Sequence, residues 1–294
     1  MQDLRPGVVA VLCLIIGGAI DGARADDKAA AEEQPALWEG RLAAFARYGA
    51  SYPASDENQV DVVPLPLPIY RGRFWRLGED RRNPIRGRLL RTDRVKLDLA
   101  FDLNFPVDSG DIDARTGMPD LDLLLEIGPE LEVELATQDM MRGRSFLGLQ
   151  LKPAFSFDGV SPTYEGLIFS PEYTYLIRSQ DDVNEYKVRV TPAFATSKYM
   201  DFYYEVTPQF ATPTRPVYSG DGGYLGTDLT FTFSHNFSDN LDFVIGSRIS
   251  FFQGAANDDS PLFIDKTNYS VYGAFTWKFW ESERRASDKD DSWP

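Results

Sequence analysis

Cysteine and histidine are almost absent from this sequence, which has one of each in 294 residues. Cys13 lies in an N-terminal segment that we expect to be removed on export, so the mature chain has no disulfide and no thiol chemistry. A single histidine without a cysteine leaves too few ligands for a zinc site. We therefore predict no metal centre and no cofactor.

Positive charge is also scarce. The chain has 30 Lys and Arg residues against 45 Asp and Glu residues, which gives a net charge of −15. Binding to nucleic-acid phosphates needs a basic surface. We therefore expect no nucleic-acid partner.

Long apolar runs are missing after residue 25, so the sequence predicts no transmembrane helix there. The apolar run at 7–20 is shorter than the roughly 20 residues that span a bilayer. It follows Arg5 and precedes "ARA" at 23–25, a small-x-small cleavage pattern. These features favour a signal peptide over residues 1–25, cleaved between Ala25 and Asp26, rather than a membrane anchor.

Alternation of apolar and polar residues dominates the rest of the chain. In "VKLDLAFDLNF" (95–105) every odd-numbered residue is apolar, and "TDLTFTFSHNF" (227–237) and "NYSVYGAFTWKF" (268–279) show the same pattern. Many such strands run about 9–13 residues, enough to cross a bilayer at a tilt and longer than the strands of soluble sandwiches. We predict an all-β fold, a closed antiparallel transmembrane β-barrel of about 12 strands (range about 10–14, by the even-number rule of bacterial barrels). The alternative is a soluble sandwich.

The pattern divides the chain into four parts. We expect a signal peptide at 1–25, a periplasmic lead-in at 26–40, an outer-membrane β-barrel at 41–280 and a flexible C-terminal tail at 281–294. The segment 121–135 carries an acidic ladder on its polar face, which we place in the barrel lumen: Glu126, Glu130, Glu132 and Glu134.

Proline occupies every second position of "VPLPLPI" (63–69), at Pro64, Pro66 and Pro68. Successive residues of a strand direct their backbone groups to opposite neighbours, so these prolines remove N–H donors on one side only. We expect one complete seam and one donor-poor seam. The donor-poor seam is either a place where a partner strand or loop engages or part of the barrel rim, where water replaces the missing bonds.

Basic residues concentrate between 71 and 94, where nine of the 30 fall. One interpretation is binding to the phosphates of lipopolysaccharide, and another is a cationic stripe that faces the acidic ladder. We favour a third, ordinary charge pairing within the lumen. The candidate residues are Arg71, Arg73, Arg76, Arg86 and Arg88.

His235 is the only candidate for a histidine base. Barrel enzymes that hydrolyse lipids need a histidine and a serine on the same face, but Phe237 occupies the matching position. Ser234 and Ser238 have the opposite parity and point to the other face, so nucleophile and base do not meet. We predict that the chain is not an enzyme and has no catalytic residues.

The acidic segment 108–122 raises the question of a divalent cation, held through Asp111 and Asp113. Its spacing is not that of an EF-hand loop. We therefore interpret it as a solvated loop.

Three blocks resemble one known family. The run "VVPLPLPIYRGRFW" (62–75) is similar to the early signature of the MipA/OmpV family of outer-membrane, MltA-interacting proteins. "YMDFYYEVTP" (199–208) resembles a second family block, and "GAANDDSPLF" (254–263) with the final aromatic strand resembles the family's ending. The similarity runs from about residue 41 to 280.

This resemblance implies a location in the outer membrane of a Gram-negative bacterium and a barrel that contacts outer-membrane lipid and lipopolysaccharide. It also implies a scaffold that brings a lytic transglycosylase and a peptidoglycan synthase together at the cell wall. Other members of the family are treated as porin-like, so the alternative function is a small diffusion channel for polar or cationic solutes.

Overall fold

The computed structural model describes residues 36–71, 75–80, 83–87, 90–91, 95–138, 143–181, 183–238 and 240–286. The predicted signal peptide and its cleavage site lie outside these residues, as do Arg73 and Arg88. Within the described chain, no helix is both long enough and apolar enough to cross a membrane.

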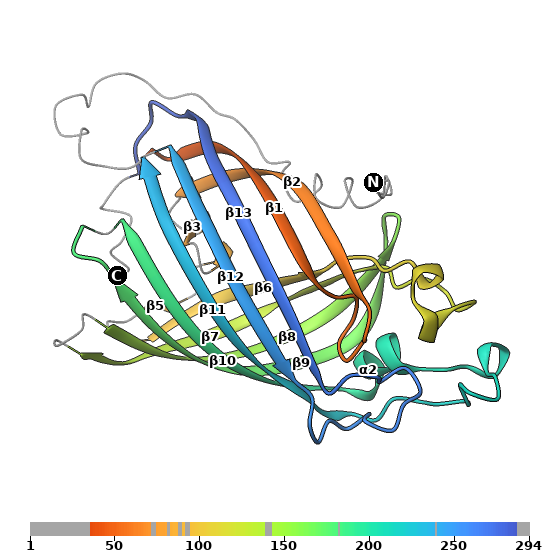
Figure 1. Ribbon diagram of the computed structural model, residues 1–294. Coiled ribbons are helices and arrows are strands. Elements are labelled where there is room, and N and C mark those ends of the chain that lie inside the picture. The colour runs from red at the N-terminus through yellow and green to blue at the C-terminus, as the bar shows by residue number, and fades with distance from the viewer. Residues whose placement is uncertain are drawn as a thin grey trace.

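One antiparallel sheet of 13 strands forms the body of the molecule (Figure 1). Its strands follow the order β4-β3-β2-β1-β13-β12-β11-β10-β9-β8-β7-β6-β5. They are β1 (Trp38–Ala50), β2 (Asn58–Arg71), β3 (Trp75–Asp80), β4 (Asn83–Gly87), β5 (Leu90–Arg91), β6 (Val95–Asn104), β7 (Leu123–Gln138), β8 (Gly143–Asp158), β9 (Ser161–Arg178), β10 (Asn184–Ala195), β11 (Gly223–Ser238), β12 (Leu241–Phe251) and β13 (Thr267–Glu281).

The strands fall into two length classes. Strands β3, β4 and β5 have six, five and two residues, whereas each of the others has between 10 and 18. The predicted all-β antiparallel architecture is confirmed. The predicted number of 12 strands is not confirmed, because the described residues form 13.

The sheet curls until its first and last strands pair. β1 pairs with β13 from Glu39↔Glu281 to Gly49↔Ser270. The two ends of the strand order, β4 and β5, are consecutive in the chain, and β4 lies beside β6. Between β4 and β5 the described residues form no strand pairing, so the predicted closure is not confirmed. We call the space on the concave side of the sheet the lumen.

The sheet extends slightly beyond the predicted barrel boundaries. β1 begins at Trp38, inside the predicted lead-in of 26–40. Beyond β13, the amide of Ser282 donates to the Trp38 carbonyl at 2.9 Å, and the amide of Leu37 donates to the Arg284 carbonyl at 2.8 Å. The first residues of the predicted tail are therefore held against β1.

Four connections gather at one end of the sheet and form what we call the cap (Figure 1). The cap comprises residues 51–57, 105–122, 196–222 and 252–266. It contains α2 (Ser197–Tyr204) and the 3-10 turns η1 (Ser109–Asp111), η2 (Asp113–Arg115) and η3 (Pro208–Phe210). At the opposite end lie shorter connections, such as 179–183, together with the segment that carries β3–β5 and the described chain ends.

Helix α2 forms where the apolar residues no longer alternate as in a strand but recur at intervals of three to four, as in a helix. Tyr199, Met200, Tyr203 and Tyr204 share one face of the helix, and all four are buried. The helix comes so close to β9 at Gly166 that a Cβ atom there would lie 2.4 Å from the Thr196 hydroxyl oxygen. Gly166 also has a φ of +105°, so glycine is required on both counts.

Candidate functional site: the lumen and its cap

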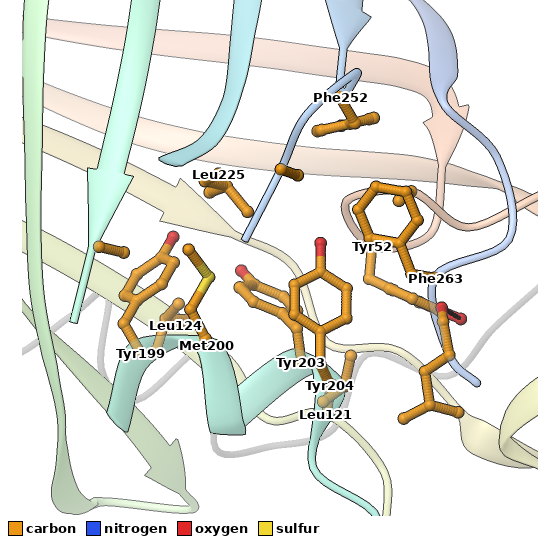
Figure 2. Close-up of a cluster of buried hydrophobic side chains, with 14 of the residues drawn as sticks. Tyr52, Leu121, Leu124, Tyr199, Met200, Tyr203, Tyr204, Leu225, Phe252 and Phe263 are labelled. Carbon is orange, nitrogen blue, oxygen red and sulfur yellow. Dashed lines mark hydrogen bonds between the residues drawn. The ribbon is translucent and has the colours of Figure 1, made fainter. Parts of the chain in front are cut away.

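The cap has its own apolar core, built around α2. Tyr199, Met200, Tyr203 and Tyr204 project from the helix to one side (Figure 2), where they meet residues of the other three connections. Those residues include Tyr52, Ile112, Leu121, Leu262 and Phe263. The rings of Tyr204 and Phe263 lie 5.8 Å apart. Because each connection buries apolar area against the helix, the four form one packed unit.

Hydrogen bonds join the same connections. Tyr204 donates its hydroxyl to the carbonyl of Pro53 at 3.0 Å, and Tyr52 donates to the carbonyl of Leu262 at 2.8 Å. Burial raises the pKa of Tyr52 to about 12 and holds the pKa of Tyr204 well above its usual range. Both phenols therefore stay neutral donors at physiological pH.

Arg115 is a buried cation in the cap. Its guanidinium donates to the Tyr203 carbonyl at 3.0 Å and the Ser109 hydroxyl at 3.1 Å, and it lies 5.7 Å from the centre of the Tyr52 ring. Burial lowers its pKa to about 10, because the charged form loses hydration. Arg115 thus ties the 105–122 connection to α2. That connection was predicted to be a solvated loop, and this prediction is wrong for Ile112 and Leu121, which are buried in the cap core.

Beneath the cap, the lumen contains a cavity of about 410 Å³. Tyr199 reaches from α2 into its wall and donates to Glu126 Oε1 at 2.7 Å. Lys152 lies 2.8 Å from Glu126 and also pairs with Asp102, and its side chain is 4% exposed. This buried network joins the cap to β6, β7 and β8.

The predicted acidic ladder lies on β7, and each of its four carboxylates has a described partner. Glu126 pairs with Lys152 and Glu130 accepts a hydrogen bond from Gln150 at 3.2 Å. Farther from the cap, Lys96 lies 2.9 Å from Glu132, and Arg144 lies 2.7 Å from Glu134. These partners come from β6 and β8, which indicates charge pairing between neighbouring strands.

More open ion pairs line the other side of the cavity. Arg189 on β10 lies 3.0 Å from Glu172 on β9, but its Nε–H lacks the alignment of a hydrogen bond. Arg248 on β12 lies 3.4 Å from Asp228 on β11. The Arg248 side chain is 48% exposed, and so its charge remains available to the cavity.

The predicted basic cluster is only partly described. Arg71 donates to Glu39 at 2.7 Å and to the Ala36 carbonyl at 2.8 Å. The backbones of Arg76 and Arg86 lie opposite each other in the β3–β4 pair. Arg71 lies at the end of the sheet away from the cap, and its described partner is not part of the acidic ladder.

The backbone nitrogens of the three prolines in β2 point away from β1. Arg71 N donates to the Leu37 carbonyl and Ser51 N to the Glu57 carbonyl, which places the odd-numbered residues of β2 in the bonds to β1. Pro64, Pro66 and Pro68 fall in the other set. On that side, the described pairing of β2 reaches only Tyr70 and Arg71, where β3 begins.

His235 lies near the end of β11 that is remote from the cap. Its Nδ1 is 2.7 Å from the Asn184 side-chain oxygen, and its ring packs edge-on against Phe237 at 4.5 Å. Ser234 is buried on the opposite face of the strand. The absence of enzymatic activity stays a prediction.

The convex face of the sheet is apolar and banded. Exposed aliphatic residues occupy the middle of the strands, including Leu147, Leu149, Val188 and Ile245. Tyr173 and Phe231 lie level with the aliphatic residues, whereas most exposed aromatic residues lie towards the two ends. Near the cap they are Tyr48, Phe169, Phe194, Phe251 and Tyr269, and at the other end they are Tyr186, Phe237, Trp277, Phe279 and Trp280. Such a band between two aromatic girdles is typical of strands that face lipid.

Residues 42–279 match the family model of MltA-interacting protein MipA. The chain belongs to the MipA family. Two of the three blocks that carried the resemblance, 199–208 and 254–263, meet in the cap, where Ser260 donates to the Tyr204 carbonyl at 3.2 Å. Membership in the MipA family was thus predictable from these blocks, but their contact was not.

The MipA-family chain is also similar to solved structures of low sequence identity. A structure of the NanC porin is 8% identical, with 81% of this chain and 100% of that chain covered and a TM-score of 0.37. An outer-membrane channel from Pseudomonas putida F1 is 10% identical, with 87% and 100% covered and a TM-score of 0.38. A search of curated proteins gives no match.

Proposed function

We propose that this MipA-family protein is a non-enzymatic β-barrel of the bacterial outer membrane that acts as a scaffold for peptidoglycan-remodelling enzymes. Family membership carries the proposal, since the family is named for interaction with MltA. The convex face supports the membrane location, because an apolar band with an aromatic girdle at each end matches the two interfaces of a bilayer.

Closure of the barrel is part of the proposal. β2 and β6 run antiparallel to each other, as follows from the alternating directions around the sheet. Together with β1 and β7–β13 they make ten long strands, an even number that suits a bacterial barrel. The prolines leave the β2 edge of this seam poor in donors, so the ring is weakest there.

The orientation follows from the lengths of the connections. Outer-membrane barrels have short periplasmic turns and longer extracellular loops. Most connections between long strands are long at the cap end and short at the other, the exceptions being the β8–β9 turn and the 72–94 segment that carries β3–β5. The cap therefore faces outward, and the opposite end with both described chain ends faces the periplasm. In this orientation Arg71 lies on the periplasmic side, which disfavours the lipopolysaccharide interpretation of the basic cluster. A lytic transglycosylase would dock at the same end.

Single cysteines test this orientation, because the mature chain has none of its own. Asp181→Cys lies in a short connection and Asp258→Cys lies in the cap, and both side chains are exposed. A membrane-impermeant maleimide added to intact cells should label only the variant at 258, and both after lysis. Labelling of the variant at 181 in intact cells would contradict the orientation.

Crosslinking from the same two positions tests the scaffold. A photo-crosslinker at 181 should capture a lytic transglycosylase, and one at 258 serves as the matched control. Equal capture from both positions, or capture from neither, would refute docking at the periplasmic end.

The cavity of about 410 Å³ favours a second candidate, a small diffusion channel. The cap argues against a steady pore, because α2 and its packed connections cover one end of the lumen. Planar-bilayer recordings separate the two candidates. Steady ion-selective conductance of the wild-type protein would favour the channel, and its absence would favour a capped scaffold.

A further inference from the structure

Side chains obstruct the cavity beneath the cap at both ends of the lumen. At the cap end, Tyr199, Phe202 and Tyr203 of α2 line it, and Tyr199 and Tyr203 project from the helix towards the strands (Figure 2). Towards the other end, inward side chains of β8 and β9 fill the lumen, since Phe146 and Leu176 are each 2% exposed. Both axial routes to the cavity are therefore blocked, and a route through the wall deserves consideration.

On one side, the cavity reaches the edge of a strand. Every residue from 100 to 105, at the cap end of β6, borders the cavity, whereas on β9 only every second residue between 168 and 174 does. Successive residues of a strand point to opposite faces, and Asp102 points into the lumen, where it pairs with Lys152. Phe101 and Leu103 therefore point to the convex face and still border the cavity. This arrangement indicates that the edge of β6, and not only its inner face, is open to the cavity.

In the closed ring proposed above, this edge of β6 faces β2. Among the described residues, β6 pairs on this side with two residues of β5, and β2 pairs with two residues of β3. These pairs lie at the ends of β2 and β6 that are remote from the cap. We call the line along which residues 58–69 of β2 face residues 98–104 of β6 the β2–β6 seam.

A ring contact indicates the approximate register of the β2–β6 seam. Phe45 lies opposite Val63 in the β1–β2 pair, and its ring stacks on that of Phe105 with 6.0 Å between the centroids. Because β2 and β6 are antiparallel, the residues that follow Val63 lie alongside those that precede Phe105. The three prolines of β2 are thus placed alongside residues 100–104, where the cavity reaches the strand edge.

The β2–β6 seam suits contact with hydrocarbon. On the convex face of β2, Val60 and Val62 are 58% and 59% exposed, and Phe101 and Leu103 lie on the same face of β6. An unpaired backbone N–H is costly in hydrocarbon, but the prolines have none to leave unpaired. An acyl chain can therefore lie along this edge at a lower cost than along an ordinary strand edge.

The cavity is polar, in contrast to the β2–β6 seam. Its walls carry seven acidic and four basic residues. Because the two signs are mixed and pair with each other, as Asp102 does with Lys152, the walls favour a polar group without selecting its charge. A molecule that suits both surroundings has a polar head group and an apolar tail.

We propose that the cavity and the β2–β6 seam together bind a single-chain lipid. Its head group lies in the cavity, and its acyl chain passes between β2 and β6 into the bilayer. The volume of about 410 Å³ accommodates a head group rather than a whole lipid. A fatty acid and a lysophospholipid share this chemistry. The inference rests on the proposed membrane location and barrel closure, but not on the docking of a cell-wall enzyme.

Two serines of β12 provide matched reporter positions. Ser250 borders the cavity, whereas Ser247 lies on the convex face of the same strand. Bimane is attached to Ser250→Cys or Ser247→Cys in phosphatidylcholine nanodiscs, which are titrated with stearic acid that carries a nitroxide quencher near its carboxyl group. Quenching at 250 should saturate and should be reversed by unlabelled oleate or lysophosphatidylcholine. Quenching at 247 should instead rise in proportion to the quencher in the bilayer. Reversal by only one competitor would identify the head group.

The two reporters distinguish this inference from the proposed function. Quenching at 247 without quenching at 250 would overturn the lipid site and leave the membrane location intact. Quenching that fails to saturate at 250 would also overturn the site, because lipid would then enter without binding. Absence of quenching at 247 would overturn the membrane location itself, and the lipid site with it.

A substitution in the β2–β6 seam tests the route. In the Ser250→Cys background, Leu103→Gln should weaken the saturable quenching at least about fivefold, because the acyl chain loses an apolar contact. Leu99→Gln is the matched control, since Leu99 lies on the same face of β6 but does not border the cavity. The control should bind as its parent does. Equal effects of the two substitutions, or an effect of neither, would overturn the seam as the route. The reporters without these substitutions decide whether lipid binds, even where a variant fails to fold.

Discussion

Truncation of Tyr204 should open the cap while leaving the strands in place. The side chain is fully buried, packs 5.8 Å from the Phe263 ring and donates a hydrogen bond to the Pro53 carbonyl. Tyr204→Ala removes both interactions and leaves a cavity, at a cost of about 3–5 kcal/mol by analogy with other aromatic truncations. Tyr204→Phe removes only the hydrogen bond, at a cost of about 1 kcal/mol.

Amide hydrogen exchange measures this opening. In Tyr204→Ala, the amides of residues 197–206 should exchange about 100-fold faster or more, because a loss of about 3 kcal/mol raises the population of the open state by about that factor. Tyr204→Phe should give an intermediate rate. The strands β7 to β12 should keep wild-type protection. Val217→Ala is the control, because Val217 is 57% exposed in the same connection and its truncation should change little.

Unchanged exchange at 197–206 in Tyr204→Ala would contradict this prediction, because the cap would then not depend on this core. Equal loss of protection throughout the sheet would contradict it too. In that case the cap and the strands would form one cooperative unit rather than two.

Three further predictions concern the lumen, the cap and the convex face. Lys152→Met should lower the free energy of unfolding in detergent by about 3–5 kcal/mol, because it leaves the buried Glu126 carboxylate without its cation; a change near zero in a urea titration would contradict this. Because the pKa of Tyr52 is raised to about 12, its contribution to cap stability is complete below pH 10 and is lost as the pH rises towards 12. Tyrosinate absorbance at 295 nm should therefore show a late-titrating class, and complete ionisation near pH 10 would refute its burial. Leu149→Arg should cost about 2–4 kcal/mol in a lipid bilayer, whereas Val160→Arg, in an exposed turn, should cost little.

The strands were predictable because their alternation is local. In β8, the outward residues Leu147, Leu149 and Leu151 alternate with inward Gln150 and Lys152, and this pattern is readable without any partner. The partners themselves were not readable. Lys152 meets Glu126 only because β7 and β8 pair in one register, and sequence alone does not fix that register.

The cap was missed for a different reason. Eight residues of helix contain only two turns, and Tyr199, Met200, Tyr203 and Tyr204 lie in an aromatic sequence that also suits a strand. Their spacing of four was the available signal. The burial of Ile112 and Leu121 was missed because most residues of 108–122 are polar, and the average polarity of a segment does not identify its few buried positions.

The pairing of β1 with β13 has a consequence for biogenesis. β1 can pair with β2 early, but it acquires its second neighbour, β13, only after almost all of the described chain has been made. Contacts of such large sequence separation slow folding and prolong exposure of unpaired edges. We therefore expect nascent molecules to need a periplasmic chaperone until Trp277 and its neighbours arrive, and truncations that remove β13 to be degraded rather than inserted.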